Sequence, residues 1–314
     1  MADLDKKIRM VAVAGPTASG KTALGIGIAK AIGGEVISCD SMQIYRGMSI
    51  ATAAPTTEEM QAVPHHLVEF LSPDEEYSVA QFCADANKVA DQIASRGAIP
   101  VLVGGTGLYM NSFTDNITFS GSNSAHVRQQ LQDRLQLEGA EALLKELASI
   151  DGEYAAKLHL SDTKRITRAL ELYYADGITM TEQVARSHDT PSRFDTVMIG
   201  ITFADREKLY DRINRRVDIM LQNGLLQEAK EAYIKGGLTA AQAIGHKELF
   251  DYFDGTATLE ECVERLKMQT RRYAKRQLSW FRRDERIHWI YADNKSAETL
   301  VAEAIEIIDK EWKK

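Results

Sequence analysis

The stretch GPTASGKT, residues 15–22, follows the apolar run VAVA near the start of the chain. It matches the pattern G-x4-G-K-[ST], in which glycines let the backbone approach an anion and successive amides point inward. The helix expected after it adds its positive end, Lys21 adds a full charge, and Thr22 offers a hydroxyl to magnesium. We therefore predict that this segment binds phosphate groups. The expected phosphate contacts are Gly15, Pro16, Thr17, Ala18, Ser19, Gly20, Lys21 and Thr22, with Thr22 as the ligand of Mg²⁺.

Short apolar runs along the chain are typical of buried parallel strands. They span residues 10–14, 35–39, 100–104, 196–202 and 288–292. Helical patterns over 21–32 and 79–96 separate the first three runs, which is the alternation of an open α/β sheet. We expect a P-loop NTPase-like parallel sheet core flanked by helices. Ligands of such sheets bind at the carboxyl ends of the strands.

The alternation of strands and helices stops after about residue 119. Residues 120–125, SGSNSA, form a polar linker, and the pattern from 125 to about 183 is helical throughout. A strand pattern returns only after residues 189–195. We predict an inserted helical subdomain over 120–190. The core then comprises 1–119 and 191–314, whose C-terminal helices form an RNA-contacting part.

Composition narrows the class of protein. The chain has 314 residues, is 44% hydrophobic and carries a net charge of −7, so the whole surface is not that of a nucleic-acid binder. Cys39, Cys83 and Cys262 lie far apart, without the spacing of a zinc site. The chain begins without an apolar signal stretch and has no run long enough to span a membrane. We expect a soluble, cytoplasmic, monomeric protein that makes no membrane contact.

Two sequence motifs that usually accompany the phosphate loop in nucleotidases are missing here. The strand over 100–103 ends in Gly-Gly-Thr where a magnesium-binding Asp is usual, and NKSA at 294–297 lacks the Asp of the guanine-binding motif. The nearest carboxylate follows another strand, at Asp40. It can bind magnesium through water, act as a general base, or cap the turn that it begins. Adjacent His65 and His66 point to opposite sides of an extended segment, so we assign them a structural role.

An ordered set of motifs resembles the tRNA dimethylallyltransferase family, also called tRNA isopentenyltransferases. The likeness covers most of the chain, and the inserted segment matches least. Its motifs are GPTASGKT at 15–22, ISCDSMQIYRGMSIATA at 37–53, PVLVGGTGLY at 100–109, DTKRITRALE at 162–171, DRINRRVDIML at 211–221, QAIGHKE at 242–248 and RRYAKRQLSWFRR at 271–283.

The resemblance implies a transfer reaction. Dimethylallyl diphosphate is the implied donor, and the phosphate loop holds the diphosphate that leaves, so no ATP is consumed. The implied acceptor is the exocyclic amine of the adenosine 3′ of the anticodon in tRNA. Catalytic roles carry over to Asp40, Thr106 and Arg216: Asp40 accepts a proton, Thr106 contacts substrate, and Arg216 contacts the diphosphate.

The same resemblance implies a tRNA-binding set around the anticodon stem-loop. Independently, residues 265–283 hold eight Lys or Arg and no Asp or Glu, which favours RNA contact by one helix face. We expect Tyr273 and Trp280 to lie in the core behind that face. The full predicted set is Asp40, Ser41, Met42, Gln43, Thr106, Arg128, Lys164, Arg165, Ile166, Thr167, Arg168, Gln242, Ala243, Ile244, Gly245, His246, Lys247, Arg272 and Arg276.

Two other functions use the same features. A small-molecule or nucleotide kinase shares the phosphate loop and can use inserted helices as a lid. A non-catalytic RNA-binding module uses only the basic segment. Transfer of label from dimethylallyl diphosphate or from ATP distinguishes the three.

Overall fold

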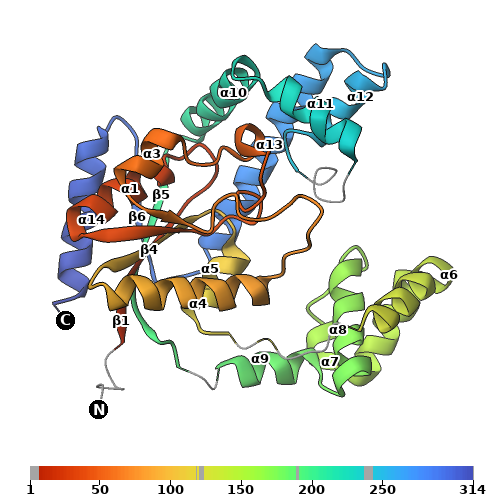
Figure 1. Ribbon diagram of the computed structural model, residues 1–314. Helices are drawn as coiled ribbons and strands as arrows, with labels where there is room; N and C mark the ends of the chain where they lie inside the picture. The colour runs from red at the N-terminus through yellow and green to blue at the C-terminus, as the bar shows by residue number, and fades with distance from the viewer. Residues whose placement is uncertain (1–6, 118, 120–123, 189–190, 237–242, 314) are drawn as a thin grey trace. The chain divides into compact units, whose positions relative to one another are not determined.

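The computed structural model describes residues 7–117, 119, 124–188, 191–236 and 243–313. It divides into two compact units, Met1–Thr114 with Arg193–Lys314, and Asp115–Ser192. The first unit is built on a six-stranded sheet with the order β3-β2-β4-β1-β5-β6, and every pairing is parallel (Figure 1). The strands are β1 (Ile8–Ala14), β2 (Gly34–Ser38), β3 (His65–His66), β4 (Ile99–Gly104), β5 (Phe194–Thr202) and β6 (Ile287–Tyr291).

The expected α/β fold is confirmed, and each predicted strand is present. The central β1 is flanked by β4 and β5 and is almost fully buried, as a continuous apolar run requires. The structure adds one edge strand, β3, which the sequence pattern did not reveal because it has only two residues. His66 donates or accepts at Nε2, 2.7 Å from Glu35 Oε2, and His65 Nδ1 lies 2.8 Å from Val63 O, so both rings have structural partners.

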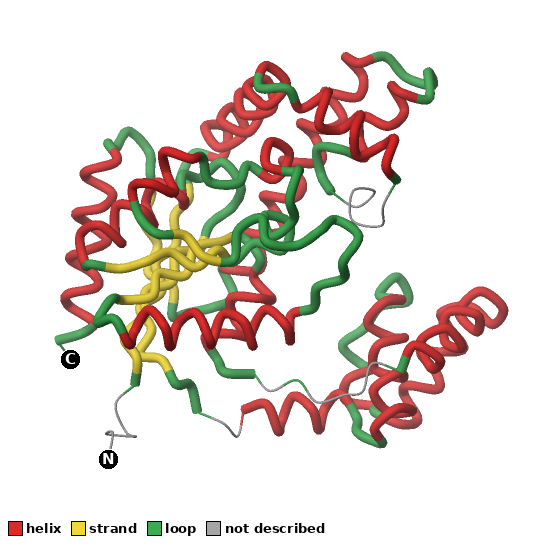
Figure 2. Tube along the Cα trace, in the orientation of Figure 1, coloured by secondary structure: helices red, strands yellow, loops and turns green. Residues whose placement is uncertain are grey.

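Helices cover both faces of the sheet, and Figure 2 shows the strands enclosed by them. On one face α1 (Lys21–Ile32) and α14 (Ala297–Glu311) pack on the strands, and Ile28 and Ile308 are fully buried there. The other face carries α4 (Val79–Ser95), α5 (Gly107–Thr114) and the end of α13 (Leu259–Phe281). Phe82, Phe113 and Phe281 fill that layer with almost no exposed surface. Burial of such aromatic side chains supplies a large part of the hydrophobic stabilisation.

A cap of helices completes the first unit. It comprises α10 (Arg206–Gln222), α11 (Leu225–Lys235) and α12 (Phe250–Phe253), together with the first half of α13. Val217, Leu225 and Leu266 form its buried core. Two short helices, α2 (Ser49–Thr52) and α3 (Thr57–Ala62), lie in the connection between β2 and β3. These elements surround the phosphate loop, so they determine the shape of the site.

The second unit is helical and has its own core. Its helices are α6 (Ala125–Ile150), α7 (Gly152–Ala155), α8 (Thr163–Asp176) and α9 (Met180–His188). Gly139 has φ 81° and ψ 168°, which breaks α6 into two arms. Leu143, Leu147 and Leu170 are fully buried between α6 and α8. Most of the expected linker, residues 120–123, lies outside the described residues.

Candidate active site

The phosphate loop occupies the turn between β1 and α1. Gly20 has φ 96° and Ala18 has φ 63°, both in the left-handed region, so the loop bends more sharply than an ordinary strand-to-helix turn. A Cβ atom on Gly15 would lie 2.7 Å from Ile201 O, which restricts that position to glycine. The local geometry is therefore the anion-binding form that the motif predicts.

Two side chains hold this loop, one from the helical cap and one from the second half of α13, and the sequence predicted neither contact. Arg212 Nε of α10 donates a 2.9 Å hydrogen bond to Ala18 O. Gln277 of α13 accepts from Thr17 N at 2.8 Å and donates from Nε2 to Gly105 O at 3.0 Å. Gln277 is 5% exposed. Its signals in the sequence are its place in the motif at 271–283 and its polar side chain on the apolar face of a helix.

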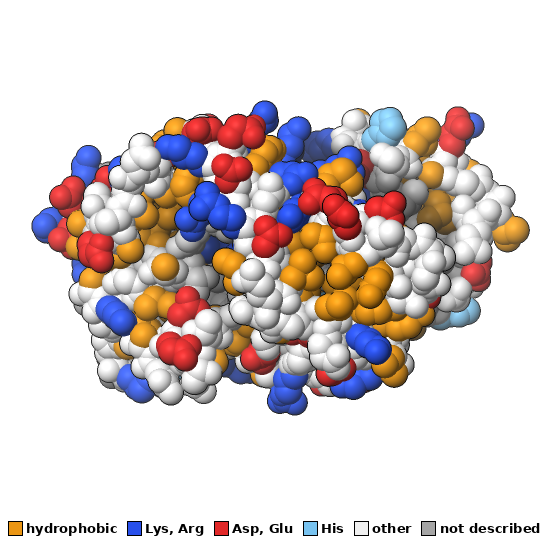
Figure 3. Space-filling view, turned by 90° about the horizontal axis from the view of Figure 1, so that it is seen from above, with side chains coloured by type: hydrophobic (Ala, Val, Ile, Leu, Met, Phe, Trp, Pro, Cys, Tyr) orange, Lys and Arg blue, Asp and Glu red, His pale blue; other side chains and the backbone are white. Residues whose placement is uncertain are grey.

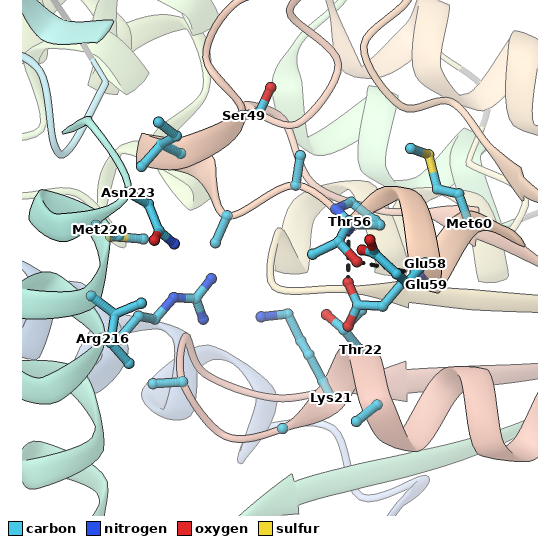
Figure 4. Close-up of a pocket in the computed structure, with 18 of the residues that line it drawn as sticks. Lys21, Thr22, Ser49, Thr56, Glu58, Glu59, Met60, Arg216, Met220 and Asn223 are labelled. Carbon is cyan, nitrogen blue, oxygen red and sulfur yellow. Dashed lines mark hydrogen bonds between the residues drawn. The ribbon is translucent and has the colours of Figure 1, made fainter. Parts of the chain in front are cut away.

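Lys21 and Arg216 bring two positive charges to the same cavity, and Figure 4 shows their side chains directed toward each other. Lys21 is 9% exposed. Burial, together with the charge of Arg216, lowers the pKa of Lys21 to about 8, and the charge of Asp40 opposes the shift. Burial also lowers the pKa of Arg216, again against Asp40. Neither cation forms an ion pair within the described part of the chain, so an added anion would relieve their repulsion.

Two neighbouring cavities share these cations in their linings. The outer cavity has a volume of about 840 Å³ and the inner cavity about 230 Å³. Lys21, Thr22, Arg216 and Met220 line both. The inner cavity has both polar and apolar lining residues. The polar lining includes Thr17, Asp40, Ser41, Gln43, Tyr273 and Gln277, and the apolar lining includes Ile213, Val217, Met220, Ile244 and Leu266.

Asp40 lies at the carboxyl end of β2 and lines the inner cavity. Its Oδ1 accepts a 3.0 Å hydrogen bond from Met42 N, so the turn-capping role is real. Capping uses one oxygen and leaves the other Asp40 oxygen for a ligand. Thr106 Oγ1 accepts from Ser41 N at 3.1 Å, and Thr106 N donates to Cys39 O at 3.3 Å. Thr106 thus holds the turn that carries Asp40.

Two neighbours of Asp40 are buried. Cys39 is 0% exposed, and burial raises the pKa of its thiol well above the usual value, so it behaves as a small buried hydrophobe. Gln43 is 9% exposed and uses its amide within the chain. It accepts from Ser38 Oγ at 3.0 Å and donates to Thr52 O and Ala53 O at 3.3 and 3.0 Å. A base edge at Gln43 would compete with these partners, and that contact stays a prediction.

The predicted RNA contacts of the helical unit divide into exposed and buried positions. Lys164 and Arg165 are exposed on α8. Arg128 and Arg168 both form ion pairs with Glu171, which is 5% exposed, at 3.1 and 3.0 Å. These residues and Thr167 line a surface cavity of about 300 Å³. Ile166 is fully buried in the core of the unit, so its side chain is not available for RNA contact in this structure.

The segment Ala243–Lys247 is likewise mixed. Ala243 is 1% and His246 0% exposed, whereas the Lys247 side chain is 44% exposed. Ile244 and Gly245 line the inner cavity. Gln242 lies outside the described residues. The buried positions of this segment therefore shape the cavity, and Lys247 is the position open to RNA phosphates.

The basic helix α13 is partly neutralised by the chain itself. Arg265 pairs with Asp251 at 2.7 Å, and Lys267 with Asp218 at 2.9 Å. Arg272 and Arg276 are exposed and form no ion pair with any described residue. Figure 3 shows Lys and Arg mixed with Asp and Glu on the face seen from above, in keeping with the net charge. Phosphate contact is therefore expected from selected positions on α13.

The expectation that Tyr273 and Trp280 lie in the core is only half correct. Tyr273 is partly buried, and it lines the inner cavity. Trp280 is 36% exposed, so its placement in the core was wrong. The reason is that α13 ends one residue later at Phe281, and the indole lies against the backbone of Gly107, with Nε1 3.4 Å from Asn111 Oδ1.

The described residues include no group of three or more His, Cys, Asp or Glu arranged to hold a metal ion. No helix among them is both long and apolar enough to cross a membrane. The parallel sheet, the glycine-rich loop and the paired cations define a transferase with a P-loop fold that acts on a phosphorylated substrate.

Comparison with known proteins identifies the family. The IPP transferase family model matches residues 43–284, and an Isopentenyl transferase model matches residues 8–69. The chain belongs to the IPP transferase family. It is 46% identical over 286 residues to the tRNA dimethylallyltransferase of Halalkalibacterium halodurans, covering 90% of this chain and 91% of that protein. It is 45% identical over 283 residues to the tRNA dimethylallyltransferase of Bacillus subtilis, covering 89% and 90%.

Two solved structures are also similar. The full-length tRNA isopentenylpyrophosphate transferase from Bacillus halodurans has a TM-score of 0.71 and 41% identity, covering 98% of this chain and 99% of that one. A eukaryotic dimethylallyltransferase, crystallised acting on tRNA, has a TM-score of 0.82 and 29% identity, covering 96% and 80%. Both comparisons extend over nearly the whole chain. The chain is thus a prenyl transferase, and neither a kinase nor a non-catalytic module is favoured.

Proposed function

We propose that this enzyme transfers the dimethylallyl group of dimethylallyl diphosphate to the exocyclic amine of the adenosine 3′ of the anticodon in tRNA. The observation that carries the proposal is the pair of cations, buried Lys21 and half-buried Arg216, which line both cavities. A diphosphate bound in this cavity would have both cations in its lining, and Asp40 lines the same cavity. The named activity of the close relatives supports the same reaction.

The leaving diphosphate is the first requirement of the reaction. As the allylic carbon–oxygen bond breaks, the bonding electrons go to the diphosphate oxygen. Inward amides of the phosphate loop, the Lys21 ammonium and the Arg216 guanidinium stabilise that growing charge. Removing one such preorganised donor typically costs about 3–4 kcal/mol of transition-state stabilisation. Because both cations lack a partner in the described chain, this charge stabilisation is ready before the donor binds.

Magnesium fits the donor set in a limited way. Mg²⁺ keeps several waters and is usually bound by one or two protein oxygens together with substrate phosphates. Thr22 supplies a hydroxyl at the start of α1 and lines both cavities. When bound, the ion would neutralise charge on the diphosphate. Thr22 would hold it, while Lys21 and the loop amides bind the remaining phosphate oxygens.

The acceptor amine needs help because its lone pair is delocalised into the purine ring. As the new nitrogen–carbon bond forms, the nitrogen must lose a proton. The Asp40 carboxylate accepts it, and a well-placed general base contributes about 10²–10⁴-fold. Met42 N and the Thr106–Ser41 contact fix the carboxylate in place. Thr106 is therefore assigned to positioning Asp40, in addition to the substrate contact that its motif predicts.

The five-carbon tail belongs in the apolar part of the inner cavity. Ile213, Val217 and Leu266 are among its apolar lining residues. The cavity has a volume of about 230 Å³, and a prenyl tail bound in it would displace water from the place where the allylic cation develops.

The tRNA must present its adenine to the same cavity, and enzymes that act on a base take it out of the stack. Anticodon loops are recognised through unstacked bases and phosphates. Arg272 and Arg276 on α13 and Lys247 offer exposed charge within the first unit. Lys164 and Arg165 offer it on the helical unit.

A double-label assay tests the proposal. Unmodified tRNA and Mg²⁺ are incubated with dimethylallyl diphosphate carrying ³H on C1 or ³²P on the β-phosphate. We expect ³H on tRNA and ³²P in free diphosphate. Transfer of ³²P to tRNA, or label only from [γ-³²P]ATP, would support a kinase. Binding of tRNA without transfer of either label would leave an RNA-binding module.

A further inference from the structure

The buried carboxylate of Glu228 links three parts of the first unit that are distant in sequence. It lies on α11, and its side chain is 12% exposed. Glu228 Oε2 accepts from Ile50 N at 2.9 Å, and Oε1 accepts from Ala51 N at 2.9 Å. His246 Nε2 lies 2.8 Å from the same Oε1. We call this arrangement the Glu228 bridge. It consists of Glu228, His246, Ile50 and Ala51.

Chemistry fixes the direction of the histidine contact. An ionised carboxylate only accepts hydrogen bonds, so His246 Nε2 must carry the proton. His246 is fully buried, and its Nδ1 has no partner among the described residues. A nitrogen left in this state is destabilising. Among the described residues, the carboxylate of Glu228 is therefore the hydrogen-bond partner that holds the His246 ring in place.

The bridge holds the wall between the two cavities. The wall is α2 with Ala53: Ser49, Ile50 and Ala53 line the outer cavity, and Ala51 and Thr52 line the inner one. At its other end, Gln43 Nε2 donates to Thr52 O and Ala53 O. Gln43 is three residues from Asp40, in the same turn. The wall thus connects Glu228 on one side with the turn of the general base on the other.

Backbone packing gives the link a second, independent basis. Gly245 has φ +115°, and a Cβ atom there would lie 2.9 Å from Ala51 Cβ. The segment Ala243–Lys247 therefore packs directly on the wall. Its last residue, Lys247, is exposed. A contact made by RNA at this segment would reach α2 through both the packing and His246.

We infer that Glu228 is a positioning residue that couples the RNA-facing segment 243–247 to the wall of the acceptor cavity. Binding of the anticodon stem-loop orders the wall through the bridge and so sets the distance between the adenine and Asp40. The expected effect on kcat rests on the proposed function. The structural coupling between segment 243–247 and the wall does not.

Glu228→Gln is the sharpest variant because it keeps size and shape. Its amide NH₂ would replace either Oε2, where it faces the N–H of Ile50, or Oε1, where it faces the N–H of Ala51 and the His246 ring. In either orientation the side chain cannot accept from all three donors. Glu231→Gln is the matched control: Glu231 is exposed on the same helix and contacts only Gln227 among the described residues. We expect Glu228→Gln to lower kcat about tenfold with little change in KM for dimethylallyl diphosphate, and Glu231→Gln to lower neither.

Hydrogen exchange gives a readout independent of turnover. We expect the anticodon stem-loop to slow exchange of the amides in 48–54 about tenfold in the wild type and in Glu231→Gln, but not in Glu228→Gln. A Glu228→Gln protein that retains both this protection and full kcat overturns the inference. If Glu228→Gln lowers both kcat and thermal stability but retains the stem-loop protection, Glu228 has only a structural role. That result also overturns the inference. If the wild type transfers no prenyl group, yet the stem-loop protects 48–54 in the wild type and not in Glu228→Gln, the proposed function fails and the coupling stands.

Discussion

Gln277 on α13 accepts a 2.8 Å hydrogen bond from the backbone amide of Thr17 in the phosphate loop, across 260 residues of sequence. The same side chain donates to Gly105 O at 3.0 Å, in the turn after β4. One buried amide thus joins the phosphate loop, the turn that carries Thr106, and the basic helix. The loop that binds the donor and the helix assigned to RNA are therefore mechanically connected.

Replacement of Gln277 tests whether its two hydrogen bonds hold the phosphate loop in shape. Gln277→Glu keeps an acceptor for Thr17 N but cannot donate to Gly105 O, which places two oxygens in contact inside the protein. Gln277→Leu removes both bonds. We expect both variants to raise KM for dimethylallyl diphosphate about tenfold or more and to lower the free energy of unfolding by about 1–3 kcal/mol. An unchanged KM in both would show that the loop keeps its shape without Gln277.

Removing the charge of Asp40 should affect chemistry more than binding. Asp40→Asn keeps an oxygen that accepts from Met42 N but cannot accept the amine proton. We expect the rate constant of a single turnover to fall by about 10²–10⁴-fold, with thermal stability nearly unchanged. The exposed Asp74→Asn serves as the control. A reduction smaller than tenfold would mean that Asp40 only orients the substrate.

The pKa of Lys21 predicts a pH dependence. Because burial and Arg216 lower this pKa to about 8 from 10.5, the free enzyme loses the ammonium as pH rises through 8. The bound diphosphate is an anion and raises the pKa again. We expect kcat/KM for the donor to decline above pH 8, whereas kcat at saturating donor persists to higher pH.

Stability of the ligand-free protein should move in the opposite direction. Between pH 8 and 10.5 the unfolded chain binds more protons at Lys21 than the folded chain, so this group makes stability rise with pH. Below pH 8 Lys21 is protonated in both the folded and the unfolded state, so its charge then lowers the free energy of unfolding by the full amount. Arg216→Gln removes the neighbouring charge and should shift both transitions to higher pH. Transitions that stay at the same pH would exclude Lys21 as their origin.

Gly104 should tolerate no side chain. A Cβ atom there would overlap the carbonyl oxygen of Cys39, which is backbone and cannot rotate away. We expect Gly104→Ala to lower the free energy of unfolding by about 3 kcal/mol, the upper part of the usual range for overpacking. Gly152→Ala is the control, since its added methyl meets nothing within 4 Å. Chemical denaturation of both variants measures the difference.

The salt dependence of tRNA binding tests the basic helix. Arg272 and Arg276 are exposed without ion pairs among the described residues, whereas Lys267 pairs with Asp218. We expect Arg272→Ala and Arg276→Ala each to weaken binding and to reduce the slope of log K against log salt by about 0.7–0.9 for each RNA phosphate that the variant no longer neutralises. Lys267→Ala should leave the slope unchanged. Equal slopes in all three variants would place the RNA elsewhere.

Local chemistry made much of this protein predictable from its sequence. The run before GPTASGKT is apolar without interruption because β1 is buried on both faces, and Gly15 and Gly20 are needed at positions closed to other residues. Strand and helix periodicity, which depend on near neighbours, indicated the α/β core. Asp40 was found because a strand end beside a phosphate loop is a fixed place in this topology.

Contacts between distant segments were decided only by the tertiary structure. Nothing near Gln277 or Glu228 in the sequence shows that their partners are Thr17 and Ile50, because such pairs form only when the helical cap closes over the sheet. The exposure of Trp280 and the burial of His246 have the same origin. Periodicity states which face of a helix is apolar, whereas the packing of the whole chain decides where that face is covered and which polar groups must find partners there.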